Sequence, residues 1–192
     1  MQYYVEITLR PDAEVSLGFL WQKVFQQIHL ALVEIKDEKE TVNVGISFPK
    51  YGDRTFPLGN SLRLFATTSD NLEKLRLDQW LNRLLDYLSV SDIKNVPNGV
   101  DLYASFFRRQ FKSNPERLAR RQAKRKGISF EDAMKHYETM EKETSDLPFI
   151  VLNSLSSAQR LKLFIQKEMK NVGSAGPFNT FGLSKSATVP WF

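Results

Sequence analysis

The strongest constraint on the fold is the order in which two hydrophobic periodicities follow each other in the first half of the chain. Alternation of apolar residues indicates strands, and apolar residues spaced by three and four indicate helices. These patterns predict strands over residues 2–9, 42–48, 61–66 and 90–96 and helices over residues 17–35 and 71–88. Along the chain the order is strand, helix, strand, strand, helix, strand. We expect an interruption of the second helix near Asp78. This βαββαβ order predicts an α+β fold with an amino-terminal ferredoxin-like domain.

The turn sequence Pro97-Asn98-Gly99 marks the expected domain boundary, which gives domains of residues 1–97 and 98–192. In the second domain we predict a strand over 102–112, a helix from Asn114 or Pro115 to Lys126 and a helix over 130–143. Strands over 149–155 and 160–168 and a loop over 171–180 follow. Gly127 suits the position just after a helix, and Ser113 with Glu116 has capping-box spacing. The second domain is therefore an α+β half with a helix of strongly basic composition.

The charge of the chain is concentrated in one segment. The 27 Lys and Arg residues exceed the 22 Asp and Glu residues, for a net charge of +5. Nine of the cations and only one acid, Glu116, lie within residues 108–126, so this segment carries +8 and the rest of the chain −3. A slightly acidic body with one basic element indicates a surface that binds a polyanion.

The predicted basic helix places its cations on one face. The five cations are Arg117, Arg120, Arg121, Lys124 and Arg125. Their relative positions 0, 3, 4, 7 and 8 match the helical period of 3.6 residues per turn. The opposite face offers only Leu118, Ala119 and Ala123, which is too little apolar area for a membrane-surface or calmodulin-type helix. Contact with a nucleic-acid backbone is the favoured interpretation, and a solvated charged face is the alternative.

The strand that precedes this helix adds side chains that can contact bases. By alternation, Arg108, Gln110 and Lys112 share one face. Arg and Gln form paired hydrogen bonds with guanine and adenine edges, so two of them spaced two apart could contact adjacent bases. Surface strands often carry such residues, so this signal depends on the neighbouring helix.

His29 is the candidate general base. It follows Ile28 at the edge of the apolar face of the first helix, whereas His136 lies among charged residues and is expected to face solvent. One interpretation of His29 is a half-buried histidine bonded to a backbone carbonyl; the other is a general base with a pKa near neutrality. In RNA cleavage such a base takes the proton of a 2′-hydroxyl, which attacks the adjacent phosphorus without a metal ion.

Three hydroxyl groups could contact a sugar or a phosphate near such a base. Ser154, Ser156 and Ser157 lie in a predicted turn between two strands. Serine is also common in turns for purely structural reasons.

Several classes of function lack their residues. The chain has no cysteine and two histidines, which excludes disulfides, cysteine-based metal sites and histidine-rich clusters. It contains neither a G-x-S-x-G elbow nor a Walker loop. Because no apolar run is long enough for a membrane span and residues 1–9 lack the form of a signal peptide, we expect a cytoplasmic protein. We expect no cofactor and no metal.

Ordered motifs over nearly the whole chain carry a family resemblance. They are Leu9-Arg10-Pro11-Asp12, His29, Gly45-Ile46-Ser47-Phe48-Pro49, Lys112-Ser113-Asn114-Pro115-Glu116-Arg117-Leu118, Asp146-Leu147-Pro148-Phe149, Gly182-Leu183-Ser184-Lys185 and Val189-Pro190-Trp191-Phe192. With them the chain resembles the repeat-processing endoribonucleases of type I-F (Csy-type) CRISPR systems, which act in antiviral defence.

The resemblance implies a metal-independent cleavage at the 3′ base of a CRISPR repeat hairpin, with a 2′,3′-cyclic phosphate product. His29 matches the catalytic histidine and Ser154 the serine that orients the ribose; Phe181 and Ser156 are candidate supporting residues. Arg108 and Gln110 match base-reading positions, and the arginine-rich helix would dock in the major groove of the stem, which a short open-ended hairpin admits. Lys112, Ser157 and Leu161 complete the candidate RNA contacts. The mature RNA would stay bound, making the chain a subunit of the type I-F surveillance complex and a monomer when isolated.

Two positions depart from the best-known form of the family. Phe181 replaces a tyrosine, so a phenolic hydroxyl is missing, and Leu161 replaces a phenylalanine that stacks under the lowest base pair. An aliphatic side chain is a poorer platform than an aromatic ring, whose stacking is worth about 1–3 kcal/mol per base. A catalytically silent subunit that binds an RNA hairpin is the main alternative function, and a sequence-independent DNA-binding protein is a weaker one.

Overall fold

The computed structural model describes residues 1–111, 115–138, 145–153 and 159–192. It is a mixed α/β structure that divides into two compact units. The core unit comprises Met1–Arg108 and Leu147–Phe192, and the basic unit comprises Arg109–Asp146.

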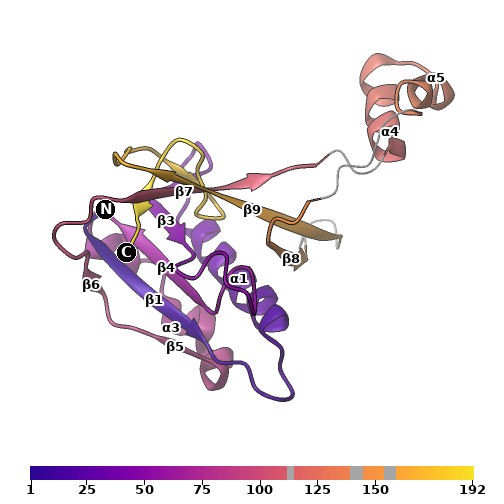
Figure 1. Ribbon diagram of the computed structural model, residues 1–192. Coiled ribbons are helices and arrows are strands. Elements are labelled where there is room, and N and C mark those ends of the chain that lie inside the picture. The colour runs from indigo at the N-terminus through magenta and orange to yellow at the C-terminus, as the bar shows by residue number, and fades with distance from the viewer. Residues whose placement is uncertain (112–114, 139–144, 154–158) are drawn as a thin grey trace. The chain divides into compact units, whose positions relative to one another are not determined.

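A five-stranded sheet forms the centre of the core unit (Figure 1). It contains β1 (Tyr3–Leu9), β3 (Val44–Ser47), β4 (Ser61–Ala66), β5 (Leu88–Val90) and β6 (Lys94–Asn95). The strand order is β3-β4-β1-β5, β6 also pairs with β1, and each pair is antiparallel. Alternate residues of β1, namely Val5, Ile7 and Leu9, are buried, as the period-two pattern predicts.

Helix α1 (Leu17–Glu34) packs beside this sheet (Figure 1). Ser16 begins the helix, because its hydroxyl accepts a hydrogen bond from the Phe19 N–H at 3.4 Å. One face of the helix is buried, with Leu20, Trp21, Val24, Phe25, Ile28, Ala31 and Leu32. The Trp21 indole donates to the Gly59 carbonyl at 2.8 Å, which orients the helix on the core unit.

The second predicted helix is divided into three short elements. They are α2 (Ser69–Glu73), α3 (Leu77–Leu81) and the 3₁₀ helix η1 (Asn82–Tyr87). The first interruption lies two residues before the expected Asp78, at Arg76, whose φ of 48° is in the left-handed region and ends regular helix geometry.

Strands from the second half of the chain complete the core unit. The order β11-β7-β9-β8 joins β7 (Tyr103–Arg109), β8 (Phe149–Asn153), β9 (Arg160–Lys170) and β11 (Val189–Pro190). A further short strand, β10 (Phe178–Asn179), pairs with β2 (Thr41–Val42), so the predicted loop over 171–180 contains a strand. The core unit thus continues past residue 97, because residues of both halves share one hydrophobic cluster. The division into a first domain and an RNA-binding half stays a prediction.

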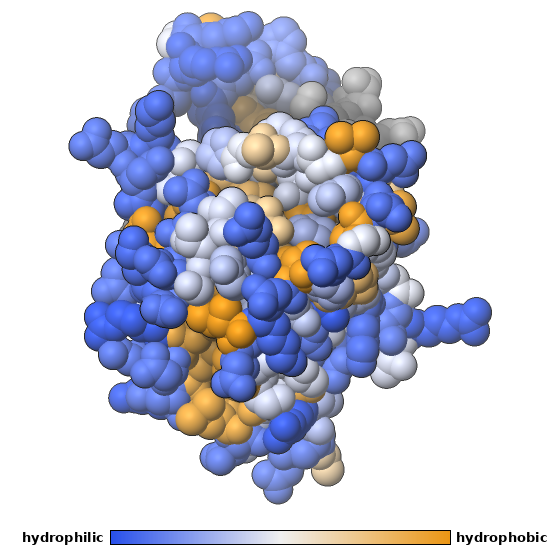
Figure 2. All heavy atoms as spheres, turned by 90° about the vertical axis from the view of Figure 1, so that its left-hand side faces the viewer, coloured by the Kyte–Doolittle hydropathy of each residue, from blue (hydrophilic) through white to orange (hydrophobic). Residues whose placement is uncertain are grey.

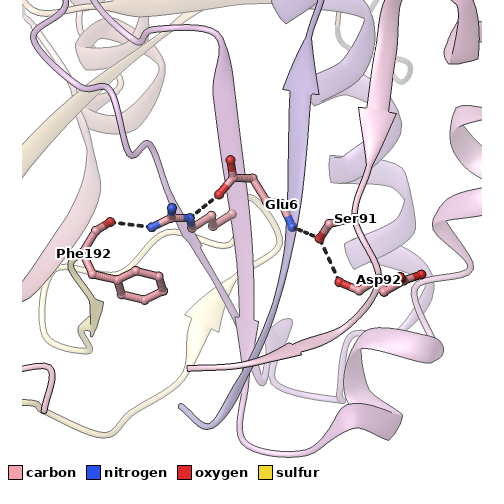
Figure 3. A network of polar contacts seen from close by, with 5 residues as sticks. Glu6, Ser91, Asp92 and Phe192 are labelled. Carbon is pink, nitrogen blue, oxygen red and sulfur yellow. Dashed lines mark hydrogen bonds and ion pairs between the residues drawn. The ribbon is translucent and has the colours of Figure 1, made fainter. Parts of the chain in front are cut away.

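The carboxy-terminal residue of the chain packs on β1 and β4. The Arg63 guanidinium donates to Glu6 and to the Phe192 backbone oxygen, and it lies 4.3 Å from the centre of the Phe192 ring. The Glu6 N–H donates to the Ser91 hydroxyl at 3.0 Å, as Figure 3 shows. These contacts connect Phe192 with two strands of the five-stranded sheet.

The described part of the basic unit contains two helices, α4 (Pro115–Lys126) and α5 (Phe130–Lys135). Gly127, with φ of 64°, follows α4 at the predicted position. Ser129 caps α5 by accepting from the Asp132 N–H at 3.0 Å. The predicted helix over 130–143 is therefore confirmed in its first part, and residues 139–144 lie outside the described residues.

The helices of the described ranges include none that is both long and apolar enough to cross a membrane. On the face that Figure 2 shows, hydrophobic residues form separate patches among hydrophilic ones.

Candidate functional site

His29 is held on two sides by residues from the far end of the chain. Its Nδ1 lies 2.8 Å from the Thr180 backbone oxygen, and its ring stacks on Phe181 with 4.1 Å between centroids and 12° between planes. A carbonyl oxygen only accepts hydrogen bonds, so Nδ1 carries the proton of the neutral ring. The lone pair is then on Nε2, and none of the described residues forms a hydrogen bond with that atom.

The turn that carries Thr180 and Phe181 is fixed by its own hydrogen bonds. The Asn179 carboxamide oxygen accepts from the N–H groups of Phe181 at 2.9 Å and Leu183 at 3.2 Å. Gly182 has φ of 68°, and a Cβ there would lie 2.5 Å from the Ile46 side chain. A side chain at position 182 would therefore clash with Ile46 and strain the backbone, so this turn requires glycine.

Burial lowers the pKa of His29 below 6.5, and the hydrogen bond to Thr180 opposes this shift only in part. The imidazole is thus neutral at pH 7 and can accept a proton through Nε2. The geometry agrees with the interpretation of His29 as a half-buried histidine bonded to a backbone carbonyl, and its role as a general base stays a prediction.

The other candidate residues of the core unit lie in different environments. Arg108, which ends the first segment of this unit, is exposed near the end of β7, and the exposed Gln110 follows that strand in the chain, within the basic unit. The predicted strand over 102–112 ends at Arg109, and its residues 104–107 are all buried. Both faces of this part of β7 are therefore covered, while the predicted common face of Arg108, Gln110 and Lys112 lies beyond it. Leu161 is half-buried opposite Leu152 and packs against the core.

Four candidate residues lie outside the described residues. They are Lys112, Ser154, Ser156 and Ser157.

The five cations predicted to share a face are exposed on α4, in the set Arg117, Arg120, Arg121, Lys124 and Arg125. The interruption of this surface by Ala119 and Gln122 has a structural cause. Ala119 is fully buried, and Gln122 is 9% exposed and accepts a hydrogen bond from the Tyr137 hydroxyl at 2.6 Å. Helix α5 packs on this side of α4, so the cations project from the remaining surface.

One cation of α4 has two local partners. Arg120 lies 3.8 Å from the Glu116 carboxylate, and its guanidinium carbon is 5.9 Å from the centre of the Phe130 ring. Both charged side chains of the ion pair are largely exposed, so the pair contributes little stability in water.

In the part of the chain that the structure describes, no three His, Asp or Glu residues are grouped as metal ligands. His136 is exposed on the basic unit, as predicted.

The two units together define a class of protein. A held, neutral imidazole with one free basic nitrogen suits acid–base chemistry, and a helix with five exposed cations suits a polyanion. The class is therefore that of a mixed α/β protein with a neutral, half-buried imidazole on one unit and an exposed basic helix on the other.

Comparison with known proteins identifies the family. The model of the CRISPR-associated protein family Cas_Csy4 matches residues 4–192. The "CRISPR-associated endonuclease Cas6/Csy4" of Pseudomonas aeruginosa (strain UCBPP-PA14) is 37% identical over 193 residues, covering 100% of both chains. The protein of the same name from Escherichia coli (strain UTI89 / UPEC) is 35% identical, again over 100% of both chains. The chain belongs to the Cas_Csy4 family, which confirms the predicted family and its nuclease class.

A solved structure described as "An RAMP protein binding different RNA substrates" aligns over 98% of this chain and 99% of that chain. Its TM-score is 0.35 at 13% identity, which is too low to support an argument.

Proposed function

We propose that this chain is an endoribonuclease that binds the stem-loop of CRISPR repeat RNA and cleaves it at the 3′ base of the hairpin, without a metal ion. The observation that carries the proposal is the setting of His29: Nδ1 is bound to Thr180, the ring is stacked on Phe181, and Nε2 keeps its lone pair. Family membership over the full chain supports the RNA substrate.

The proposed reaction begins when Nε2 of His29 takes the proton of a ribose 2′-hydroxyl. The resulting O2′ attacks the adjacent phosphorus, the bond from phosphorus to O5′ breaks, and the protonated His29 returns its proton to O5′. The products are a 2′,3′-cyclic phosphate and a 5′-hydroxyl. The bond to Thr180 fixes the tautomer, and the Phe181 ring restricts rotation of the imidazole. By resemblance, Ser154 orients the ribose and Ser156 supports the site.

The basic unit would hold the RNA stem. The exposed cations of α4 can pair with phosphates, which makes affinity fall steeply as salt rises. Arg108 and Gln110 are exposed and would contact bases near the bottom of the stem. Leu161, Lys112 and Ser157 remain proposed RNA contacts.

The proposal includes the fold and the cellular role. The antiparallel order β3-β4-β1-β5 with α1 beside it supports a ferredoxin-like domain. The cleaved RNA would stay bound in the cytoplasm, with the chain as a subunit of the type I-F surveillance complex and a monomer when isolated.

Cleavage of a repeat hairpin in EDTA tests the reaction, with the same RNA carrying a 2′-deoxy sugar at the scissile nucleotide as its matched control. We expect cutting of the first RNA only, with a 2′,3′-cyclic phosphate detected by mass spectrometry. Loss of cutting in EDTA, or cleavage of the deoxy RNA, contradicts the mechanism. Tight binding without cutting would instead favour a silent RNA-binding subunit.

A further inference from the structure

Gln26 forms a side-chain bond between the helix of His29 and an edge strand. The Asn153 N–H donates to Oε1 of Gln26 at 3.3 Å. Helix α1 and strand β8 pack against each other, and Ile150 and Leu152 are the buried residues of β8 (Figure 1). Asn153 is the last residue of this strand, so the bond is made where β8 ends.

The register of β8 explains why the exposed Asn153 N–H is directed away from β9 and can reach this partner. The Ile165 N–H donates to the Pro148 oxygen at 2.9 Å, and Asn153 lies opposite Arg160. Because hydrogen-bonded and non-hydrogen-bonded pairs alternate along an antiparallel ladder, Asn153 and Arg160 form a pair that does not exchange hydrogen bonds. The Asn153 N–H therefore points away from β9. β8 is the last strand in the order of its sheet, and Gln26 supplies the acceptor for this outward N–H.

Gln26 and His29 lie three residues apart on α1, which places them next to each other along the helix. Helix α1 is thereby bonded at two neighbouring positions to segments distant in the sequence: Gln26 to the end of β8 and His29 to the turn at Thr180. In the chain, Asn153 is followed directly by Ser154, the residue to which the resemblance assigns the ribose.

We propose that Gln26 is a positioning residue, which holds the end of β8 at a fixed place relative to His29 and so aligns the ribose contact with the general base. This inference rests on the proposed function. The side chain of Gln26 takes no part in proton transfer; it acts through the strand end that its amide oxygen holds. Its loss should therefore lower the rate of the chemical step while leaving the affinity for the hairpin in place.

Three variants test this role. Gln26→Met keeps the length of the side chain and removes the acceptor, and Gln26→Glu keeps an acceptor oxygen. Gln27→Met makes the same change at the neighbouring half-buried glutamine. Each variant is assayed by single-turnover cleavage at saturating protein and pH 8, and by hairpin affinity. We expect Gln26→Met to be at least about tenfold slower, since small misplacements of reacting groups are costly. Its affinity should stay within twofold of wild type, and Gln26→Glu and Gln27→Met should cleave within threefold of wild type.

Amide hydrogen exchange at Asn153 gives a readout that does not depend on cleavage. It should be faster in Gln26→Met than in the other two variants. An unchanged cleavage rate in Gln26→Met, or a Gln26→Glu variant as slow as Gln26→Met, overturns the positioning role. If the wild type fails to cut the hairpin, the proposed function fails, and unchanged exchange at Asn153 would show separately that Gln26 does not hold the strand end.

Discussion

The surroundings of His29 in the core unit and of the cations in the basic unit differ in how firmly side chains are held. His29 is half-buried, bonded to Thr180 and stacked on Phe181, next to a cluster of more than thirty buried residues. On α4 and α5, Ala119 and Ala133 are the fully buried residues, and the cations lie in solvent. Proton transfer requires one geometry, which extensive packing provides, whereas binding by charge requires exposure and tolerates variation in geometry.

This difference predicts that substitutions around His29 change the rate of cleavage and that substitutions on α4 change affinity. The following predictions test the separation in order of decreasing effect.

The largest effect is expected for His29→Ala. Removal of the proposed general base should lower the saturated single-turnover rate by about 10³-fold, within the range typical of general acid–base catalysis. Affinity for the repeat hairpin, measured by filter binding or fluorescence anisotropy, should stay within twofold of wild type because the cations of α4 are untouched. His136→Ala is the control, because it removes the exposed histidine of the other unit. A large loss of affinity in His29→Ala would mean that the two functions are not separated.

On the basic unit, the double variant Arg121→Ala/Arg125→Ala should act in the opposite way. Both arginines are exposed on α4. The loss of two phosphate contacts should reduce the slope of log affinity against log salt by about 1.5–2 and weaken binding about 10- to 100-fold at moderate salt. The rate at saturating protein should not change.

Arg54→Ala/Arg83→Ala is the matched control, since it removes two exposed arginines from the core unit. If this control weakens binding as much as the α4 variant does, then net charge, and not the basic face, sets the affinity.

These regions also differ in what the sequence could predict. The strand over Ser61–Ala66 and helix α1 agree with their hydrophobic periodicity to within one residue, because burial on one face leaves a repeating pattern. The break at Arg76 could be located only approximately, since a left-handed residue other than glycine has no clear sequence signal. The strand β10 was missed because its two residues gain their structure from β2, far away in the chain.

The surroundings of His29 could be predicted from the sequence only in part. His29 stood out through its place on an amphipathic helix, but Thr180 could not be found, because it contacts His29 with a backbone oxygen 151 residues away. A backbone contact leaves no preference for a residue type at its position. The burial of Gln122 could not be found from the sequence either, because its hydrogen bond with the Tyr137 hydroxyl depends on the packing of α5.

A moderate effect on cleavage is expected when Phe181 is substituted, and it should be visible in the pH dependence of the reaction. Burial lowers the pKa of His29, so the acid limb of kcat/KM should have its midpoint below 6.5, with activity lost as pH falls through it. Phe181→Ala uncovers one face of the imidazole and should move this midpoint up toward 6.5. It should also slow cleavage several-fold at pH 8. Phe181→Tyr keeps the ring and is the control. A midpoint that is unchanged in Phe181→Ala would show that the ring does not contribute to the burial of His29.

The free energy of unfolding should also depend on the protonation of His29. Because the folded state binds a proton at His29 less readily than the unfolded chain, the contribution of the neutral ring is complete above pH 6.5. It is lost as pH falls from 6.5 to the lower pKa of the folded state. Thermal unfolding between pH 5 and 8 should show this loss, and His29→Gln should remove it.

The smallest effect is expected within the basic unit, from Tyr137→Phe. This change removes the donor to the buried Gln122 amide and leaves its oxygen unpaired, which costs about 1–3 kcal/mol of local stability. Because α4 keeps all its cations, hairpin affinity should fall by only about two- to threefold, the cleavage rate at saturation should be unchanged, and amide exchange in α4 and α5 should accelerate. The double variant Gln122→Leu/Tyr137→Phe replaces both polar partners by apolar groups and should recover much of the lost protection. A slower saturated cleavage rate in Tyr137→Phe would contradict the separation of binding from chemistry, since Tyr137 belongs to the basic unit and bonds there to Gln122.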